Sequence, residues 1–354
     1  MRIGRYGPSA LTSPTSDTAN PAVPPRVVVV GDVTTDIVAV LEAPLAFGSD
    51  TPGTVQTLPG GQGANTAAWL AWLGRQVTLV GAVGDDDAGQ ARLRELASAG
   101  VVCAVRRCPG VATGTVLVLS GAQDRTMVSQ RGANLHLDGH DVTEALAAST
   151  DARHLHLSGY PLLDGPSRSG GLTALAEARR RGLTTSVDAA SAQPLRQAGP
   201  DRFLAWVAEV DILLANADEA AVLTGTADPG EAARHLARIA RNSVVKLGRD
   251  GAVWCDGNTV LHHAEAPAAP VVDSTGAGDA FAAGLVSAWV DGSPPGAALR
   301  HGCELGSMSV TMVGGRPGPS PGRGPRVTLA ERGGVVVASP SDGMPASTAT
   351  GAGP

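Results

Sequence analysis

A glycine-rich segment, residues 272–285, has the residue types and spacing best suited to chemistry in this sequence. It reads VDSTGAGDAFAAGL and combines a short apolar run, a turn with Gly276 and Gly278, and a stretch of helical periodicity. Glycine allows positive φ and a close approach of the backbone to a ligand. The N–H groups of such a turn, with the positive end of the following helix, make a hole for an anion such as a transferring phosphoryl group.

Asp279 lies in the first turn of this predicted helix, beside the anion hole. A carboxylate would repel a bound anion if binding were its only task. It can, however, accept a proton from a hydroxyl during phosphoryl transfer, where positioning matters more than base strength. The structural alternative is an aspartate that favours a helix start, after a plain turn. The pattern G-x-x-x-x-G-K-[ST] is absent from the chain, and Phe281 breaks a G-x-G-x-x-G match here.

The elements that must hold this segment alternate along the chain. Strand-like apolar runs cover residues 26–30, 77–83, 154–157, 184–188, 211–215 and 243–247. Helical periodicity covers residues 65–73, 172–181, 218–223 and 231–241. Repeated strand–helix units predict an α/β fold with a mostly parallel sheet covered by helices.

Two segments interrupt this alternation, residues 37–58 and residues 114–128. Each contains two strand-like pieces without a helix between them, so each is expected to pair antiparallel outside the main sheet. Together they predict a small second sheet over one edge of the core, in the position of a lid.

Composition and charge narrow the class of protein. The net charge is −6 and basic residues are scattered, which argues against nucleic acid or an anionic membrane surface as a partner. The sequence contains no run of ~18 apolar residues, the length that would predict a membrane span. The cysteines lack metal-ligand spacing, which indicates inert thiols in a reducing, cytoplasmic setting. They are Cys103, Cys108, Cys255 and Cys303.

The two ends of the chain differ from its body. Residues 1–25 lack the apolar region of a secretory signal and are predicted to be a disordered leader. Residues 319–354 are rich in Gly, Pro and Ser, and we expect them to be mostly disordered. One apolar run there, residues 335–338, is too weak a signal to count as a predicted strand.

Two motifs resemble signatures of a known family. VDSTGAGDAFAAG resembles the C-terminal signature of the PfkB family of ribokinase-like carbohydrate kinases, and GGQGANTAA at residues 60–68 resembles its N-terminal, GGKGAN-type signature. Family-like pieces occur in order: VGDVTTDIV, GAVGDDDAG, TGTVLVLSGAQDRTMVSQRGAN, NADEAAVLTG and VVKLGRDGAVW. The resemblance implies a ribokinase-like three-layer sandwich over residues 26–318, with a small antiparallel β lid from about residues 36–60 and 112–131.

The resemblance also assigns a reaction, the ATP-dependent transfer of the γ-phosphoryl group to a hydroxyl of a sugar or related polyol. It makes Asp279 the catalytic base and gives the anion hole to the N–H groups of Gly276, Ala277 and Gly278. The positions that it implies for binding the acceptor are Asp36, Gly60, Gly61 and Asn65. Without the resemblance, Asn65 could simply cap the following helix.

For the nucleotide, the resemblance implies that Asn216 and Glu219 organise Mg²⁺ and phosphate through water. An N-terminal capping box would need the same two residues at the same spacing. Lys246 would meet the phosphates, or else be a solvated lysine, and Gly248 and Gly251 would pass beneath the nucleotide.

Some features of the sequence bear on the cation and on the acceptor. Asp273 and Thr275, together with the loop near Gly314–Pro317, resemble the monovalent-cation site of some family members, which suggests activation by K⁺. Thr34 and the stretch at residues 158–160 depart from the ribose-specific pattern and argue against ribose itself.

On the lid side, Arg131 either contacts the substrate or pairs with a surface carboxylate. Asn134 is a further candidate for a substrate contact, and Asp32 is a weaker one than Asp36.

Other functions remain open at this point. A nucleoside kinase of the adenosine or pseudouridine type would need an aromatic base pocket, for which the candidates are Phe47, Trp69 and Tyr160. A sugar-phosphate kinase would need basic residues that the segments around Asp36 and Gly60 lack. A non-catalytic sugar-binding regulator would have little need for the retained catalytic residues. The expected partner is a small molecule, with a homodimer through the lid as a further possibility.

Overall fold

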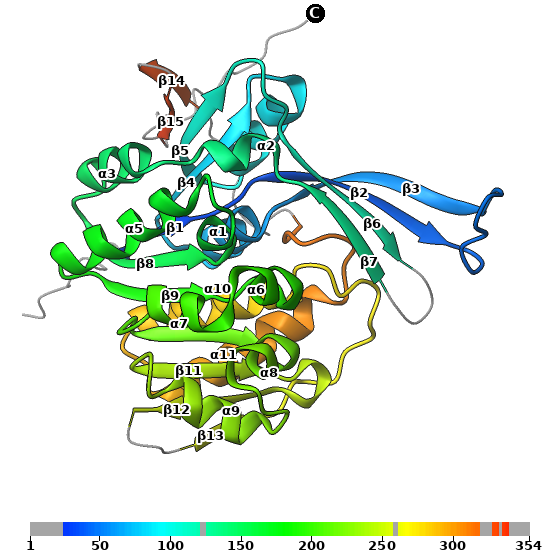
Figure 1. The fold of residues 1–354 in the computed structure, drawn as a ribbon. Coiled ribbons are helices and arrows are strands. Elements are labelled where there is room, and N and C mark those ends of the chain that lie inside the picture. The colour runs from blue at the N-terminus through cyan, green and yellow to red at the C-terminus, as the bar shows by residue number, and fades with distance from the viewer. Residues whose placement is uncertain (1–23, 121–124, 258–260, 319–327, 333–334, 340–354) are drawn as a thin grey trace, which may run out of the picture.

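The computed structural model describes residues 24–120, 125–257, 261–318, 328–332 and 335–339. An 11-stranded sheet runs through the body, in the order β13-β12-β11-β10-β9-β8-β1-β4-β5-β15-β14 (Figure 1). Its seven central strands are parallel. They are β1 (Arg26–Val30), β4 (Val77–Gly84), β5 (Val101–Cys108), β8 (Ala152–Ser158), β9 (Thr184–Asp188), β10 (Ile212–Asn216) and β11 (Asn242–Lys246).

Antiparallel strands complete both edges of this sheet. At one edge are β12 (Ala252–Asp256) and β13 (Leu261–Ala264), and at the other are β15 (Val335–Ser339) and β14 (Thr328–Arg332). Two strands therefore lie within the segment that was predicted to be mostly disordered. The remaining residues of that segment, and residues 1–23 of the predicted leader, lie outside the described residues.

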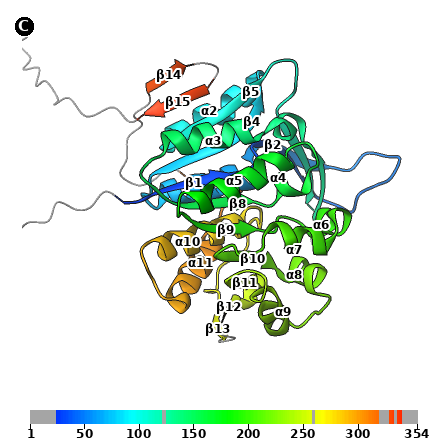
Figure 2. The same ribbon diagram turned by 60° about the vertical axis from the view of Figure 1, so that its left-hand side comes forward.

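Helices cover both faces of the sheet, as the α/β pattern predicts, and make the three layers that the resemblance implies (Figure 2). On one face lie α1 (Gln62–Trp72), α2 (Asp87–Ser98), α10 (Ala277–Val290) and α11 (Pro295–Ser309). On the other lie α3 (Gly139–Ala148), α4 (Tyr160–Leu163), α5 (Arg168–Arg180), α6 (Ala192–Ala198), α7 (Pro200–Trp206), α8 (Ala217–Thr224) and α9 (Pro229–Leu236).

The apolar run in β1 shows why the sheet is buried on both faces. Val27 and Val29 point into the core under α1 and α10, whereas Val28 and Val30 point into the core under α5. Successive side chains of a strand alternate between faces, so a strand covered on both sides needs apolar residues throughout. This confirms the predicted α/β class.

The lid is a four-stranded sheet, β3-β2-β6-β7, that projects from the body (Figure 1). Its strands are β2 (Thr34–Leu41), β3 (Gly53–Gly60), β6 (Gly114–Ser120) and β7 (Arg125–Gln130). Both predicted antiparallel pairs form, β2 with β3 and β6 with β7. The two hairpins join through a parallel pairing of β2 with β6, which the long connection through the body permits.

Within the described part of the chain, no helix combines the length and the apolar character needed to cross a membrane.

Candidate active site

The carboxyl ends of the central parallel strands gather polar side chains at one edge of the sheet. Asp32 follows β1, and Ser158, Asp188, Asn216 and Lys246 end β8, β9, β10 and β11. Ligands of open α/β sheets bind at this edge, because the loops that leave the strands open a crevice there. Lid strand β2 begins at Thr34, two residues after Asp32, and β3 ends beside it at Gly60.

The glycine-rich turn makes the start of α10. Gly276 is its N-cap residue, with a φ of 74° that favours glycine. A side chain at this position would also collide with the backbone of Gly315. The Lys246 ammonium lies 3.3 Å from the place that a Cβ on Gly278 would occupy. A helix N-terminus and a cation therefore meet at the predicted anion hole.

Asp279 lies half-buried in the first turn of α10, next to this hole. The Asn65 amide donates a hydrogen bond of 2.9 Å from Nδ2 to Oδ2 of Asp279. Burial raises the pKa of Asp279 well above its ordinary range, and the Asn65 hydrogen bond acts in the opposite direction. The second carboxylate oxygen, Oδ1, accepts no hydrogen bond from the described residues.

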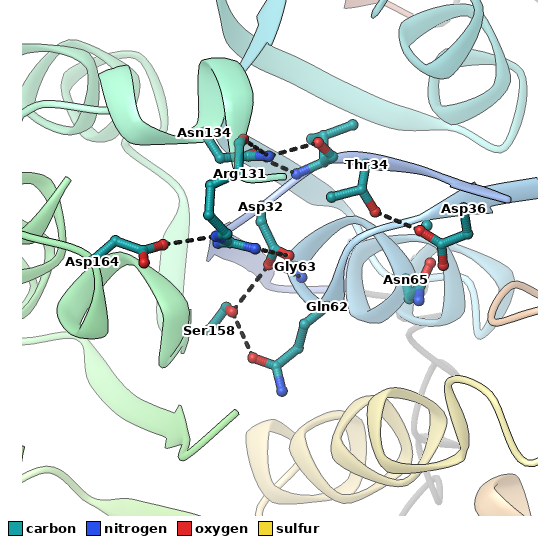
Figure 3. Close-up of polar contacts among 12 residues, drawn as sticks. Asp32, Thr34, Asp36, Gln62, Gly63, Asn65, Arg131, Asn134, Ser158 and Asp164 are labelled. Carbon is teal, nitrogen blue, oxygen red and sulfur yellow. Dashed lines mark hydrogen bonds and ion pairs between the residues drawn. The ribbon is translucent and has the colours of Figure 1, made fainter. Parts of the chain in front are cut away.

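The predicted acceptor residues gather where β3 meets α1. Asp36 is buried and accepts a 2.8 Å hydrogen bond from Thr34 Oγ1, and burial raises its pKa (Figure 3). A Cβ at Gly60 would collide with the Asp36 carboxylate, so only glycine fits beside it. Gly61, with a φ of 96°, is the N-cap residue of α1. Asn65 lies one turn into the helix, so the cap alternative for Asn65 is wrong.

Arg131 lies at the other side of this acceptor region (Figure 3). Its guanidinium donates to Asp164 Oδ2 at 2.7 Å and to Asp32 Oδ2 at 3.4 Å. It also lies over the Tyr160 ring, 4.4 Å from the centroid. The Arg131 side chain is 15% exposed and that of Asp32 is 4% exposed, so these are not the surface pairs that the sequence left open.

Asn134 has a structural role where the chain enters the lid. Its carboxamide accepts from Val33 N at 2.9 Å and donates to Val33 O at 3.0 Å. These two hydrogen bonds mimic a strand pairing and fix the chain between β1 and β2 (Figure 3). The predicted substrate contact of Asn134 therefore has no support in its hydrogen bonds.

A cavity of about 660 Å³ opens next to the anion hole. Lys246, Gly248 and Gly251 line it together with Ala277 and Gly278 of the glycine-rich turn. The other two predicted nucleotide residues, Asn216 and Glu219, are not among its lining residues. The rest of its wall is mostly apolar and includes Pro267, Val271, Phe281 and Val310. This volume and lining are those of a site for a small organic ligand.

Asn216 and Glu219 form the capping box that was the structural alternative for this pair. The Asn216 side chain accepts from Glu219 N at 2.9 Å, and the Glu219 carboxylate accepts from Asn216 N at 2.8 Å. Burial raises the pKa of Glu219 to about 7. Each carboxylate oxygen has a second lone pair, so a contact with metal-bound water is compatible with the cap. Among the described residues, no group of three or more His, Cys, Asp or Glu side chains could hold a metal ion.

Lys246 is not a solvated lysine. Its side chain is 12% exposed, and Nζ donates a 2.5 Å hydrogen bond to Asp188 Oδ2. Although burial lowers the pKa of Lys246, the nearby carboxylates of Asp188 and Glu219 outweigh this and raise it. Lys246 is therefore a fixed cation at the turn.

Asp273 ties the turn to a loop near the end of the described domain. Its two carboxylate oxygens accept hydrogen bonds from Thr275 N and Gly314 N, both at 2.9 Å. The structure thus brings the predicted cation-site residues to the loop at Gly314 that the resemblance implies.

Four polar residues of the site were not predicted, namely Gln62, Asp164, Asp188 and Arg316. Asp188 carried a signal, because it ends a predicted parallel strand and so had to lie at the carboxyl edge. Gln62 belongs to the GGQGAN motif and donates to Asp188 Oδ1 at 3.1 Å. No pattern in the sequence pointed to Asp164, and for Arg316 the resemblance indicated only the loop that contains it.

Arg316 contacts the acceptor region from behind. Its Nε donates to Asn65 Oδ1 at 3.2 Å and its Nη2 donates to Gly60 O at 3.0 Å. The side-chain oxygen of Asn65 and the backbone oxygen of Gly60, two predicted sugar-binding residues, therefore already accept hydrogen bonds from Arg316.

Comparison with known proteins agrees with these features. The family described as pfkB family carbohydrate kinase matches residues 24–321. A ribokinase of Bacillus subtilis is 29% identical over 296 residues, which are 83% of this chain and 95% of the relative. A pseudouridine kinase of Escherichia coli is 27% identical over 304 residues, 80% and 90% of the two chains. An ATP-dependent 6-phosphofructokinase of Thermoanaerobacterium thermosaccharolyticum is 27% identical over 259 residues, 72% and 80%.

Solved structures show the same fold. An adenosine kinase from Sinorhizobium meliloti superposes with a TM-score of 0.77 at 24% identity, covering 84% of this chain and 97% of the other. An aminoimidazole riboside kinase from Salmonella enterica, complexed with aminoimidazole riboside and an ATP analog, gives 0.66 at 25% identity, with coverage of 82% and 95%.

Proposed function

The chain belongs to the pfkB family of carbohydrate kinases, and from this premise we propose that it transfers the γ-phosphoryl group of ATP to a hydroxyl of an uncharged sugar. The observation that carries the proposal is the meeting of Asp279 and Asn65 next to the Gly276 turn, whose following residues Ala277 and Gly278 line the cavity. Base, anion hole and nucleotide-sized space lie within one site, which is what phosphoryl transfer requires.

The residues divide the work as follows. Asp279 Oδ1 accepts the proton of the attacking hydroxyl, while Asn65 holds Oδ2. The N–H groups of Gly276, Ala277 and Gly278 face the negative charge on the transferred group, and Lys246 adds a positive charge beside Gly278. Asp36, with the glycine backbone at the β3–α1 junction, holds the acceptor hydroxyls.

ATP would fill the cavity over Gly248 and Gly251, with its phosphates toward Lys246. Mg²⁺ would be held by those phosphates and by water on Glu219, and it would neutralise charge on the phosphates. K⁺ at the Asp273 loop is a further proposal. Replacement of K⁺ by a bulky organic cation should then lower the activity, and unchanged activity would contradict it.

The charge of the acceptor region favours an uncharged substrate. Three carboxylates, Asp32, Asp36 and Asp279, face it, and Arg131 is neutralised by Asp32 and Asp164. A sugar phosphate or sugar acid would meet the negative charge of these carboxylates, and the Arg131 guanidinium that could offset it is already paired. The relatives do not decide the matter, because their names include a phosphofructokinase as well as ribokinase and pseudouridine kinase.

Aromatic residues favour a sugar over a nucleoside. Of the three candidates for a base pocket, Trp69 is fully buried in the core and Phe47 is 92% exposed on the lid. Tyr160 remains, with one face of its ring covered by Arg131. A nucleoside acceptor would therefore stack on Tyr160 alone.

An acceptor panel tests the proposal. ADP release is measured with D-ribose, D-fructose, adenosine, pseudouridine, 2-keto-3-deoxygluconate and fructose 6-phosphate, for the wild type and for Asp279→Asn. We expect turnover with an uncharged member and at least about a 10³-fold loss of kcat in the variant. No turnover with any member, or full activity of Asp279→Asn, would overturn the proposal, and a preference for fructose 6-phosphate would overturn the uncharged class.

Two further proposals concern the cellular location of the protein and its oligomeric state. We propose a cytoplasmic protein, because all four cysteines are buried and unpaired. We also propose a homodimer through the lid, which has an apolar outer face.

A further inference from the structure

The loop that follows α11 joins the two halves of the site. Gly315 lies against Gly276 on the phosphoryl side and against Asn65 on the acceptor side, so closely that a side chain on Gly315 would collide with the Asn65 amide. Trp69 Nε1 donates to Gly315 O at 3.0 Å and anchors the loop to α1. The next residue, Arg316, is thereby brought behind Asn65.

Arg316 is buried and held by the backbone as well as by Asn65. Its side chain is 9% exposed, and Nη2 is fixed by Gly60 O at 3.0 Å. Nη1 has no hydrogen-bond partner among the described residues and lies 3.7 Å from Glu95 Oε2. Burial lowers the pKa of Arg316 to about 10, which leaves it protonated at neutral pH. A buried guanidinium with an unused donor is costly, so its position calls for a function.

We propose that Arg316 is a positioning residue for the base: it fixes the Asn65 carboxamide so that Nδ2, and not Oδ1, faces Asp279. A guanidinium only donates, so the Asn65 atom at 3.2 Å from Nε must be the oxygen. The amide nitrogen must then point the other way, where it donates to Asp279 Oδ2 at 2.9 Å. A flipped carboxamide would place two acceptors against each other at Asp279 and two donors against each other at Arg316.

This inference rests on the proposed function, since it needs Asp279 to act as the base. With Asn65 held, the carboxylate keeps a donor that stabilises its ionised form, and Oδ1 stays free for the acceptor proton. Without Arg316 the carboxamide can rotate, and the donor to Asp279 is lost for part of the time. The base then ionises at a higher pH.

The test compares pH profiles of kcat for the wild type, Arg316→Met, Asn65→Ala and the double variant. The acceptor is the member of the panel above that turns over fastest, at saturating ATP. Methionine keeps the apolar stem but has no donor. We expect Arg316→Met to lower kcat at neutral pH about tenfold, with a smaller change in KM for ATP, and to move the acid limb up by about one pH unit.

The double variant shows whether Arg316 acts through Asn65. If it does, Arg316→Met adds no further shift of the acid limb in the Asn65→Ala background. Equal shifts in both backgrounds would overturn the inference, as would an unchanged acid limb in Arg316→Met.

Arg75→Met is the matched control. Its side chain is also 9% exposed, and it bonds Ser287 and Asp291 at the far end of α10 from Asp279. We expect this variant to melt at a lower temperature but to keep the wild-type acid limb. A shifted limb in Arg75→Met would show that loosening α10 is enough and would overturn the inference.

Failure of the inference is distinguishable from failure of the proposed function. Full activity of Asp279→Asn, or no turnover with the panel, overturns both. An inactive Asp279→Asn together with an unshifted Arg316→Met overturns the role of Arg316 alone.

Discussion

Lys246 is the only lysine in a chain that has 27 Lys and Arg residues together. It lies beside the glycine-rich turn at the start of α10, paired with Asp188 and close to Gly278. A compact ammonium fits this space, whereas the larger planar guanidinium needs room for a fork of donors. The single exception to arginine thus occurs where, under the proposed function, a point charge approaches a phosphate.

We therefore predict that arginine cannot replace Lys246. Lys246→Met should lower kcat about 10²-fold, because it removes a preorganised charge from the transferred group. Lys246→Arg should also lose about tenfold or more despite its retained charge. Steady-state kinetics measures both, with melting temperature as the check on folding, and wild-type kinetics for Lys246→Arg would contradict the steric argument.

At the scale of elements, the loop at Gly314–Arg316 acts as a spacer between α10 and α1. Its glycines, Gly314 and Gly315, let the glycine-rich turn of α10 and the acceptor region at Asn65 approach each other. We predict that Gly315→Ala lowers kcat by about 10²-fold or more, because the added methyl group displaces Asn65 from Asp279.

Gly318→Ala is the control for this prediction. Gly318 lies three residues further along the chain, and a methyl group added there would have no atom within 4 Å. The activity of this variant should equal that of the wild type. A wild-type kcat for Gly315→Ala would show that the loop accommodates the methyl group without displacing Asn65, and it would contradict the prediction.

A pair of buried histidines links β8 to β9. His154 bonds Thr184 and Ser186, and His156 bonds Ser186, all at 2.8 Å. Burial lowers the pKa of His154 to about 3 and that of His156 to about 4. Between pH 6.5 and about 4 the unfolded chain therefore binds more protons, so stability is full above this window and is lost as the pH falls through it.

We predict a loss of about 1.4 kcal/mol per pH unit for each histidine below pH 6.5. Glu219 and Asp279, whose pKa values are raised, act in the opposite direction, so only a comparison isolates the histidines. Melting temperatures at pH 7 and pH 5 are compared for the wild type and for His154→Gln/His156→Gln. The melting temperature of the double variant should fall less between pH 7 and pH 5 than that of the wild type. An equal fall in both proteins would contradict the prediction.

At the scale of the whole molecule, the lid leaves an apolar face uncovered. Val55, Leu117 and Val128 share the face opposite Asp36, because side chains alternate along paired strands. They are 64%, 37% and 60% exposed. An apolar sheet face of this kind favours association with a second copy.

We predict a dimer by light scattering and a monomer for Val55→Asp/Val128→Asp. The two carboxylates would be buried without partners in a lid-to-lid interface. Leu172→Asp is the control, since Leu172 is 37% exposed but lies on α5, away from the lid. A monomeric wild type, or an unchanged dimer in the double variant, would contradict lid pairing.

The sequence by itself determined the α/β class, the lid segments and the glycine-rich turn at the start of α10. These depend on local patterns: apolar periodicity, paired strand signals, and glycines followed by Asp279. Elements with weaker patterns were missed, such as β5, whose partly exposed arginines interrupt its apolar run.

Only the tertiary structure decided which polar groups face one another. It brings Asn65 to Asp279 across 214 residues and Arg316 to Asn65 across 251, and it shows that Arg131 and Lys246 are already paired with carboxylates. The charge of the acceptor region follows from these pairings and not from the residues near Asp36 in the sequence. The physical reason is that a side chain's partner depends on packing between distant segments, for which one sequence carries no periodic signal.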